Sequence, residues 1–226
     1  MPASCAVSRC STDLMGEFLP IVLRSLAVSA SATACATLLG LPLAACLALG
    51  HWPGRKLVLV VVHAMLGLPP VVVGLVLYLL LSRSGPLGRL AWLFTPAAMV
   101  MAQTVLATPI IAALAHRAIE GRWLEYGRTL QASGASRLRA LPHLLRMAQV
   151  GIATALLAGF GRTVSEVGAV LIVGGNIAGA TRTMTTAITL ETGKGNFDLA
   201  LALGLVLVGI SITASAVVLV LSGERK

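Results

Sequence analysis

Long apolar segments with almost no charged residues are the feature that most restricts how this chain can fold. A helix needs about 20 mostly apolar residues to cross a bilayer, and five segments meet this length, at residues 19–49, 57–81, 96–115, 147–173 and 199–221. The chain is 57% hydrophobic and only 11% charged, so a soluble domain could not cover its apolar surface. We therefore expect an all-α, polytopic membrane helix bundle of about five transmembrane helices, with residues 1–18 as an N-terminal tail and residues 19–221 as the transmembrane domain.

The basic residues are divided unequally between the two sides of this arrangement. Ten lysines and arginines fall on the side that holds the connection 117–146 and the C-terminus, against six on the other side. Because positive charge gathers on the cytoplasmic side of a membrane protein, we expect this connection and the C-terminus to be cytoplasmic and the N-terminus to lie outside. No aromatic-rich basic face accompanies the net charge of +9, so we expect a lipid environment and no nucleic-acid partner.

Proline and hydrogen-bonding side chains interrupt the second and third segments. Pro69, Pro70 and Pro109 each remove a backbone donor and favour a kink or break. Such a break is tolerated inside a bilayer where neighbouring helices or a wet cavity satisfy the freed carbonyls. Three polar residues stand near Pro109 at helical spacing: Gln103, Thr104 and Thr108. The pattern fits either packing kinks in a bundle or residues that line a path for a polar solute.

The cytoplasmic connection 117–146 has the pattern of a docking element. Gly134 can end one helix and Ser136 can cap the next. Leucines among arginines then provide apolar anchors, as in a short helix that lies in another protein's groove. The residues expected to carry this contact are Leu130, Ala132, Gly134, Ala135, Ser136, Leu138 and Leu141.

Two opposite charges lie inside the fourth segment. Arg162 and Glu166 are four residues apart, which places them on one face of a helix, and isolated charges in hydrocarbon would cost several kcal/mol. We expect an intramembrane ion pair. Two roles remain open: the pair pins helix or dimer packing, or it gates the path of an anion.

A glycine-rich stretch after the fourth segment offers neutral donors and one arginine, which suit a tetrahedral oxyanion. The candidates are Asn176, Thr181, Arg182 and Thr183. An ordinary surface loop is the other interpretation of this stretch.

The sequence contains no recognisable catalytic or metal-binding set. The four histidines lack metal spacing, the four cysteines form no C-x-x-C pair, and no phosphate-binding loop is present. We therefore expect no cofactor, no metal site and no enzymatic activity in this chain.

Several runs resemble one transporter family. The run Gly-Ala-Ser at 134–136 resembles the second half of the EAA signature of ABC importer permeases, with Gly134 as the signature glycine, although Arg128 stands where that signature has an acidic residue. The runs AGFGRTVSEVGAVLIVGGN at 158–176, TRTMTTAI at 181–188 and LGLPPVVVGL at 66–75 resemble the tungstate, molybdate and sulfate branch, and most of all its tungstate-type members.

The resemblance implies an oxyanion importer of the cytoplasmic (inner) membrane: a homodimeric channel, ATPase subunits bound to the 117–146 connection, and an extracytoplasmic oxyanion-binding protein. Tungstate is the expected cargo, with molybdate or sulfate as alternatives. A secondary anion transporter or channel without an ATPase is the rival, but the chain has no evident internal repeat to support it.

Overall fold

The computed structural model describes residues 4–132, 134 and 136–223, and all regular structure in this part of the chain is helical. The expected all-α class is therefore confirmed. The helices are α1 (Ser4–Leu49), α2 (Arg55–Met65), α3 (Pro70–Leu81), the 3₁₀ helix η1 (Gly88–Leu90), α4 (Pro96–Ala132), α5 (Arg137–Met147), α6 (Gln149–Val164), α7 (Gly168–Gly174), α8 (Met184–Gly193) and α9 (Phe197–Gly223).

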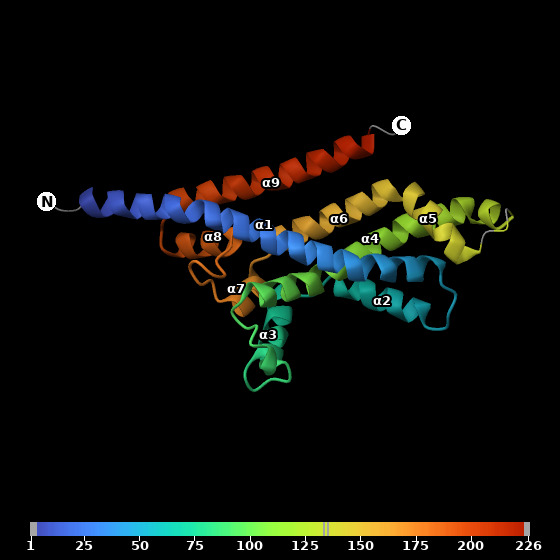
Figure 1. The fold of residues 1–226 in the computed structure, drawn as a ribbon, viewed down its shortest axis with the longest axis horizontal. Helices are drawn as coiled ribbons and strands as arrows, with labels where there is room; N and C mark the ends of the chain where they lie inside the picture. Colours follow the sequence, from blue (N-terminus) through green and yellow to red (C-terminus); the bar gives the residue numbers. More distant parts are fainter. Residues whose placement is uncertain (1–3, 133, 135, 224–226) are drawn as a thin grey trace.

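Helices α1 and α4 form the centre of the fold and lie along its longest axis (Figure 1). Small residues allow their backbones to approach: a Cβ atom added at Gly40 would lie 3.1 Å from the carbonyl oxygen of Thr108. Alanines line the contact on both helices and are fully buried, among them Ala32, Ala36, Ala44, Ala102, Ala112 and Ala115. Close packing through small residues is how helices associate in lipid, where the hydrophobic effect gives no driving force between them.

Three helical segments are long and apolar enough to cross a membrane: Phe18–Leu49, Pro96–Ala132 and Phe197–Val218. Two bent pairs bring the number to five if each counts as one span: α2 with α3, bent by 102°, and α5 with α6, bent by 72°. The first bend lies where Pro69 and Pro70 predict a break, and Pro70 is the first residue of α3. Pro109, by contrast, lies inside the continuous helix α4.

Two expected segments have different internal structure. The segment 147–173 is not a single helix, since α6 ends at Val164 and α7 begins at Gly168. The connection 117–146 is helical over its first half, because α4 continues to Ala132. Helix α1 likewise extends back into the 1–18 range, to Ser4.

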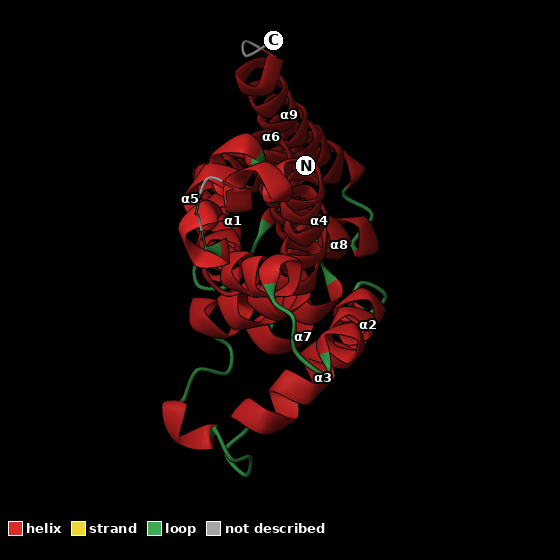
Figure 2. Cartoon of the chain, turned by 90° about the vertical axis from the view of Figure 1, so that its right-hand side faces the viewer, coloured by secondary structure: helices red, strands yellow, loops and turns green. Residues whose placement is uncertain are grey.

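Helices α3 and α9 extend away from the rest of the fold (Figure 1). Helix α3 projects at a steep angle from the axis of α1 and α4 (Figures 1 and 2) and packs on α7, where a Cβ atom added at Gly74 would lie 2.8 Å from Ala169 Cα. Helix α9 diverges from the other long helices towards its C-terminus (Figure 1), and only 6% of its most apolar window is buried. Leu201, Leu205 and Ile212 are all more than 60% exposed, as suits a helix that faces lipid.

Candidate translocation path and coupling surface

The break between α6 and α7 brings the two predicted charges into contact. Arg162 Nη2 lies 3.2 Å from Glu166 Oε2. The pair does not sit on one continuous helix as expected, because α6 ends at Val164 and Glu166 follows it. The other carboxylate oxygen, Oε1, accepts a hydrogen bond of 3.1 Å from the backbone N–H of Ala169, in the first turn of α7. Glu166 therefore joins the end of one helix to the start of the next.

Side chains from three other helices contact this break, and two of them bind its backbone carbonyls. Gln103 of α4 donates from Nε2 to the Thr163 carbonyl over 2.9 Å, and Thr185 of α8 donates to the Glu166 carbonyl over 2.9 Å. Thr33 of α1 lies 3.1 Å from the Thr163 hydroxyl. Because these bonds replace those of a continuous helix, the chain can turn here without leaving buried carbonyls unsatisfied.

Of the three polar residues predicted near Pro109, only Gln103 reaches this break. The Thr104 hydroxyl donates to the Val100 carbonyl and the Thr108 hydroxyl to the Thr104 carbonyl, each over 2.7 Å. Both side chains thus bond to the carbonyl four residues earlier in the same helix, a common arrangement for threonine in helices. The Oε1 atom of Gln103 is buried and has no hydrogen-bond partner among the described residues.

Sequence reasoning missed Thr33 and Thr185. A signal for Thr33 was present: small hydroxyl residues recur every four positions through the first apolar segment, at Ser25, Ser29, Thr33 and Thr37. That spacing marks one polar stripe on a helix. Thr185 stands among neighbouring threonines, and nothing local distinguishes it.

The predicted anion contacts of the 176–183 stretch are used within the fold. Thr181 donates to the Gly174 carbonyl and accepts from the Ile177 N–H, and it is fully buried. Thr183 and Thr186 cap the start of α8 through a reciprocal pair of hydrogen bonds. These contacts hold the turn between α7 and α8 and do not form an open cradle of donors.

Asn176 and Arg182 complete this turn. Asn176 has φ of +50°, and its side-chain amide reaches the Thr186 carbonyl over 3.4 Å. Arg182 lines a small cavity together with Glu191, whose pKa it helps to lower. The backbone carbonyls of Gly179 and Arg182 accept hydrogen bonds from Arg24 of α1, at 2.8 and 3.4 Å.

The predicted coupling element consists of a turn and a helix. Gly134 has φ of +80°, a conformation that favours glycine, and Ser136 accepts a hydrogen bond of 3.4 Å from the Arg139 N–H at the start of α5. Ala132 is exposed at the end of α4, and Ala135 lies outside the described residues.

The leucines of this element do not all project. Leu138 is 81% exposed, whereas Leu130 and Leu141 lie half-buried against the cluster that contains Ala140 and Leu144. Leu130 and Leu141 are thus partly covered by the permease itself, and Leu141 shares with Leu144 the face of α5 that packs inward. Leu124 of α4, 78% exposed, was not predicted and adds an apolar side chain near the same end of the molecule.

Comparison with known proteins identifies the family. The model of the binding-protein-dependent transport system inner membrane component matches residues 36–223. The chain belongs to this family. It is a multi-pass component of the cytoplasmic membrane and a permease subunit, and its ABC permease relatives imply ATPase and binding-protein partners.

The relatives are anion permeases. The chain is 44% identical over 179 residues to a probable anion ABC transporter permease protein of Haloferax volcanii, which covers 77% of each chain. It is 36% identical over 195 residues to the tungstate uptake system permease protein TupB of Peptoclostridium acidaminophilum, covering 84% of this chain and 86% of the relative. It is 31% identical over 175 residues to the molybdenum transport system permease protein ModB of Escherichia coli K12, covering 74% of this chain and 76% of the relative.

Proposed function

We propose that this permease translocates tungstate, or the similar molybdate, across the cytoplasmic membrane with energy from a separate ATPase subunit. The observation that carries the proposal is the similarity to tungstate uptake permeases, at 36% and 38% identity, against 30–34% for the molybdenum permeases. The chain itself would hydrolyse no ATP, and an extracytoplasmic oxyanion-binding protein would deliver the anion.

The exposed surface at the end of α4 and the start of α5 is the proposed contact with the ATPase. Leu124 and Leu138 project there into solvent although both are apolar, which is the kind of surface that a partner protein covers. In this proposal the 117–146 connection and the C-terminus lie in the cytoplasm and the N-terminus lies outside, an orientation that the distribution of basic residues supports.

The proposed anion path runs past the break between α6 and α7. Arg162 is 32% exposed there and carries positive charge, while Gln103 supplies a buried amide beside it. The path would be completed by a second copy of the chain, because the Arg162 side chain is 32% exposed in the single subunit. A homodimer with five spans per subunit is therefore part of the proposal.

Uptake into proteoliposomes tests the function. The chain would be reconstituted with its ATPase subunit and its binding protein, and uptake of tungstate, molybdate and sulfate would be measured with and without internal ATP. The proposal expects ATP-dependent uptake with tungstate preferred. ATP-independent uptake by the permease alone would contradict it and support the secondary transporter, and preference for sulfate would contradict the assigned cargo.

A further inference from the structure

Two arginines bind the carbonyl groups at the C-terminal end of α1. Arg55 Nε donates to the Leu47 carbonyl over 2.6 Å, and Arg137 Nη1 donates to the Leu49 carbonyl over 3.1 Å. The last carbonyls of a helix have no partner within it and carry partial negative charge, so cationic donors are favoured at this position. Arg55 follows α1 closely in sequence, but Arg137 is the first residue of α5.

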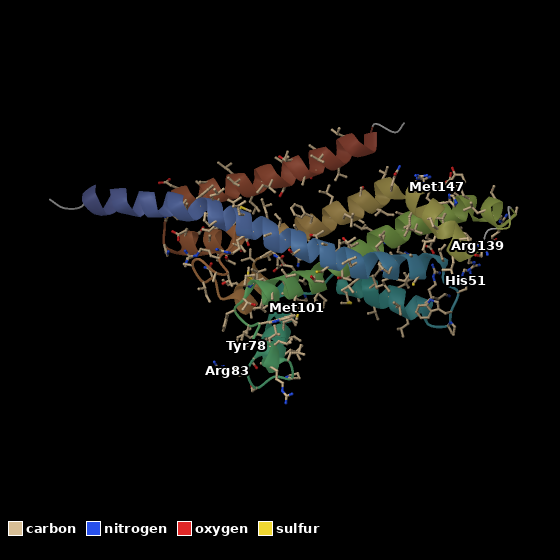
Figure 3. The ribbon with its side chains drawn as sticks, in the orientation of Figure 1. His51, Tyr78, Arg83, Met101, Arg139 and Met147 are labelled. Carbon is tan, nitrogen blue, oxygen red and sulfur yellow. The ribbon has the colours of Figure 1, made fainter. Side chains whose placement is uncertain are left out.

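The Arg137 guanidinium contacts three elements at once. Besides the Leu49 carbonyl, it hydrogen-bonds His51 Nδ1 in the connection after α1, and its Cζ atom lies 5.5 Å from the centroid of the Trp123 ring on α4. Figure 3 shows the labelled His51 at the same end of the molecule as α5. The side chain of one residue thus joins the proposed ATPase-docking helix to both central helices.

Arg137 supplies a connection between α5 and the central helices besides the chain that turns at Gly134. A Cβ atom added at Gly134 would meet nothing within 4 Å. The packed and hydrogen-bonded Arg137 side chain links α5 directly to α1 and α4.

A second arginine contact lies near the middle of α1, away from its C-terminal end. Arg24 donates to the carbonyls of Gly179 and Arg182, and the neighbouring Ser25 hydroxyl accepts a 2.6 Å hydrogen bond from the Met184 N–H at the start of α8. At 1.5 Å per residue, Arg24 and Leu49 are separated by about 37 Å along the helix, close to the thickness of a bilayer. Helix α1 therefore connects the coupling end of the molecule with the turn between α7 and α8.

We infer that Arg137 transmits the displacement of α5 to α1, and through α1 to the turn at 177–182 on the opposite side. The inference rests on the proposed function in one respect, namely that α5 docks on the ATPase. It adds a coupling residue and a route: a change at the ATPase would alter the far turn through α1, because Arg137 binds the C-terminal end of this helix and Arg24 joins its middle to the turn.

Substitution of Arg137 tests the route in the assembled transporter. Arg137→Gln removes the positive charge. Arg137→Lys keeps the charge, but an ammonium group has no planar guanidinium that can bind the Leu49 carbonyl and lie over the Trp123 ring at the same time. Arg146→Gln is the matched control, since it removes an exposed arginine from the same helix. We expect Arg137→Gln to lower tungstate uptake per ATP hydrolysed by about twofold to thirtyfold, the range for loss of one coupling contact. Tungstate uptake per ATP hydrolysed by Arg137→Lys should lie between the values for Arg137→Gln and for the control Arg146→Gln.

A second readout does not depend on the anion. Ala178 is exposed in the far turn, so a cysteine placed there, after replacement of the four native cysteines by serine, reports access of a charged maleimide. We expect ATP with vanadate to change the labelling rate in the unmodified protein and in Arg146→Gln, and to leave it unchanged in Arg137→Gln. Co-purification of the ATPase with each variant shows that the complex still assembles.

The outcomes separate the inference from the proposed function. If the labelling change depends on Arg137 but no oxyanion is taken up, the route stands and the cargo is wrong. If uptake is normal and Arg137→Gln behaves as Arg146→Gln in both assays, the route is overturned and the function stands. If Arg137→Gln does not assemble with the ATPase, the two assays are decided by Arg137→Lys. Uptake and labelling by Arg137→Lys equal to those of Arg146→Gln would then overturn the inference.

Discussion

Arg162 and Glu166 form one ion pair in two different environments: the Arg162 side chain is 32% exposed and the Glu166 side chain only 3%, with 3.2 Å between Nη2 and Oε2. The carboxylate also accepts the N–H of Ala169 at the start of α7. The two partners are therefore not equivalent. Loss of the arginine leaves a buried charge, whereas loss of the carboxylate leaves a guanidinium that water can reach.

The first prediction follows from this asymmetry. Arg162→Ala should destabilise the protein by about 2–3 kcal/mol, less than the 3–5 kcal/mol of a fully buried pair because the guanidinium is partly solvated. Glu166→Gln keeps an acceptor for the Ala169 N–H and should cost about 1 kcal/mol. Denaturant unfolding in detergent micelles measures both values, and equal losses in the two variants would contradict the prediction.

The exchange of the two charges is the control for this pair. Arg162→Glu combined with Glu166→Arg keeps the spacing but turns a guanidinium towards the N–H groups of α7, so it should not restore stability. Uptake then separates the two roles of the pair: a stable Glu166→Gln variant without uptake supports gating, and one with normal uptake supports packing alone.

The sequence predicted this pair but not the break that contains it, and the reason is physical. The spacing of Arg162 and Glu166 is local information. The end of α6 depends on Gln103, Thr33 and Thr185, which come from helices far away in the chain. Hydropathy over 147–173 is continuous, so it cannot reveal that distant side chains replace the helical hydrogen bonds.

Local backbone chemistry was more informative than hydrophobicity at the coupling element. The Pro69-Pro70 bend and the Ser136 cap were predictable because each rests on the residue's own covalent structure. The sequence could not predict which leucine is exposed. Leu138 and Leu141 differ only in whether their face of α5 meets the core. The contact between Arg137 and Leu49 joins residues that no local pattern relates.

The second prediction concerns the turn at Gly134. Its φ of +80° is unfavourable for a β-branched side chain, although space around it is open, so Gly134→Val should distort the turn through backbone strain of about 1–2 kcal/mol. We expect membrane insertion to be retained and uptake to be lost. Gly134→Asn, which tolerates positive φ, is the control and should keep more than half of the uptake. Normal uptake by the valine variant would show that the turn conformation is not needed.

The third prediction distinguishes the two faces of α5. Leu138→Ser removes an exposed side chain and should reduce co-purification of the ATPase while leaving the unfolding midpoint unchanged. Leu144→Ala removes a fully buried side chain and should destabilise the permease by about 2–5 kcal/mol. A pull-down and a thermal unfolding curve for each variant test this. Undiminished ATPase binding by Leu138→Ser would remove Leu138 from the proposed contact.

The fourth prediction concerns the pH dependence set by Glu191 at the end of α8. Its Oε1 atom accepts from Lys194 Nζ over 2.8 Å and its Oε2 atom from Asn196 Nδ2 over 3.1 Å, and the side chain is only 8% exposed. The Lys194 hydrogen bond is the main reason that the pKa of Glu191 is lowered, with Asn196 and Arg182 adding to it and burial acting against it. A lowered folded-state pKa means that the ionised carboxylate stabilises the fold above the unfolded-state pKa of about 4.3, and that this contribution is lost as the pH falls through the folded-state value.

Glu191→Gln should therefore have a lower melting temperature than the unmodified protein at pH 7, and the gap should close as the pH falls from about 5 towards 3. Lys194→Gln is the matched variant: it removes the main cause of the lowered pKa, so its own loss of stability on acidification should be smaller than in the unmodified protein. Thermal unfolding in detergent at half-unit steps of pH measures all three curves. A gap between the unmodified protein and Glu191→Gln that stays constant from pH 7 to 3 would mean that the carboxylate charge does not stabilise this end of α8.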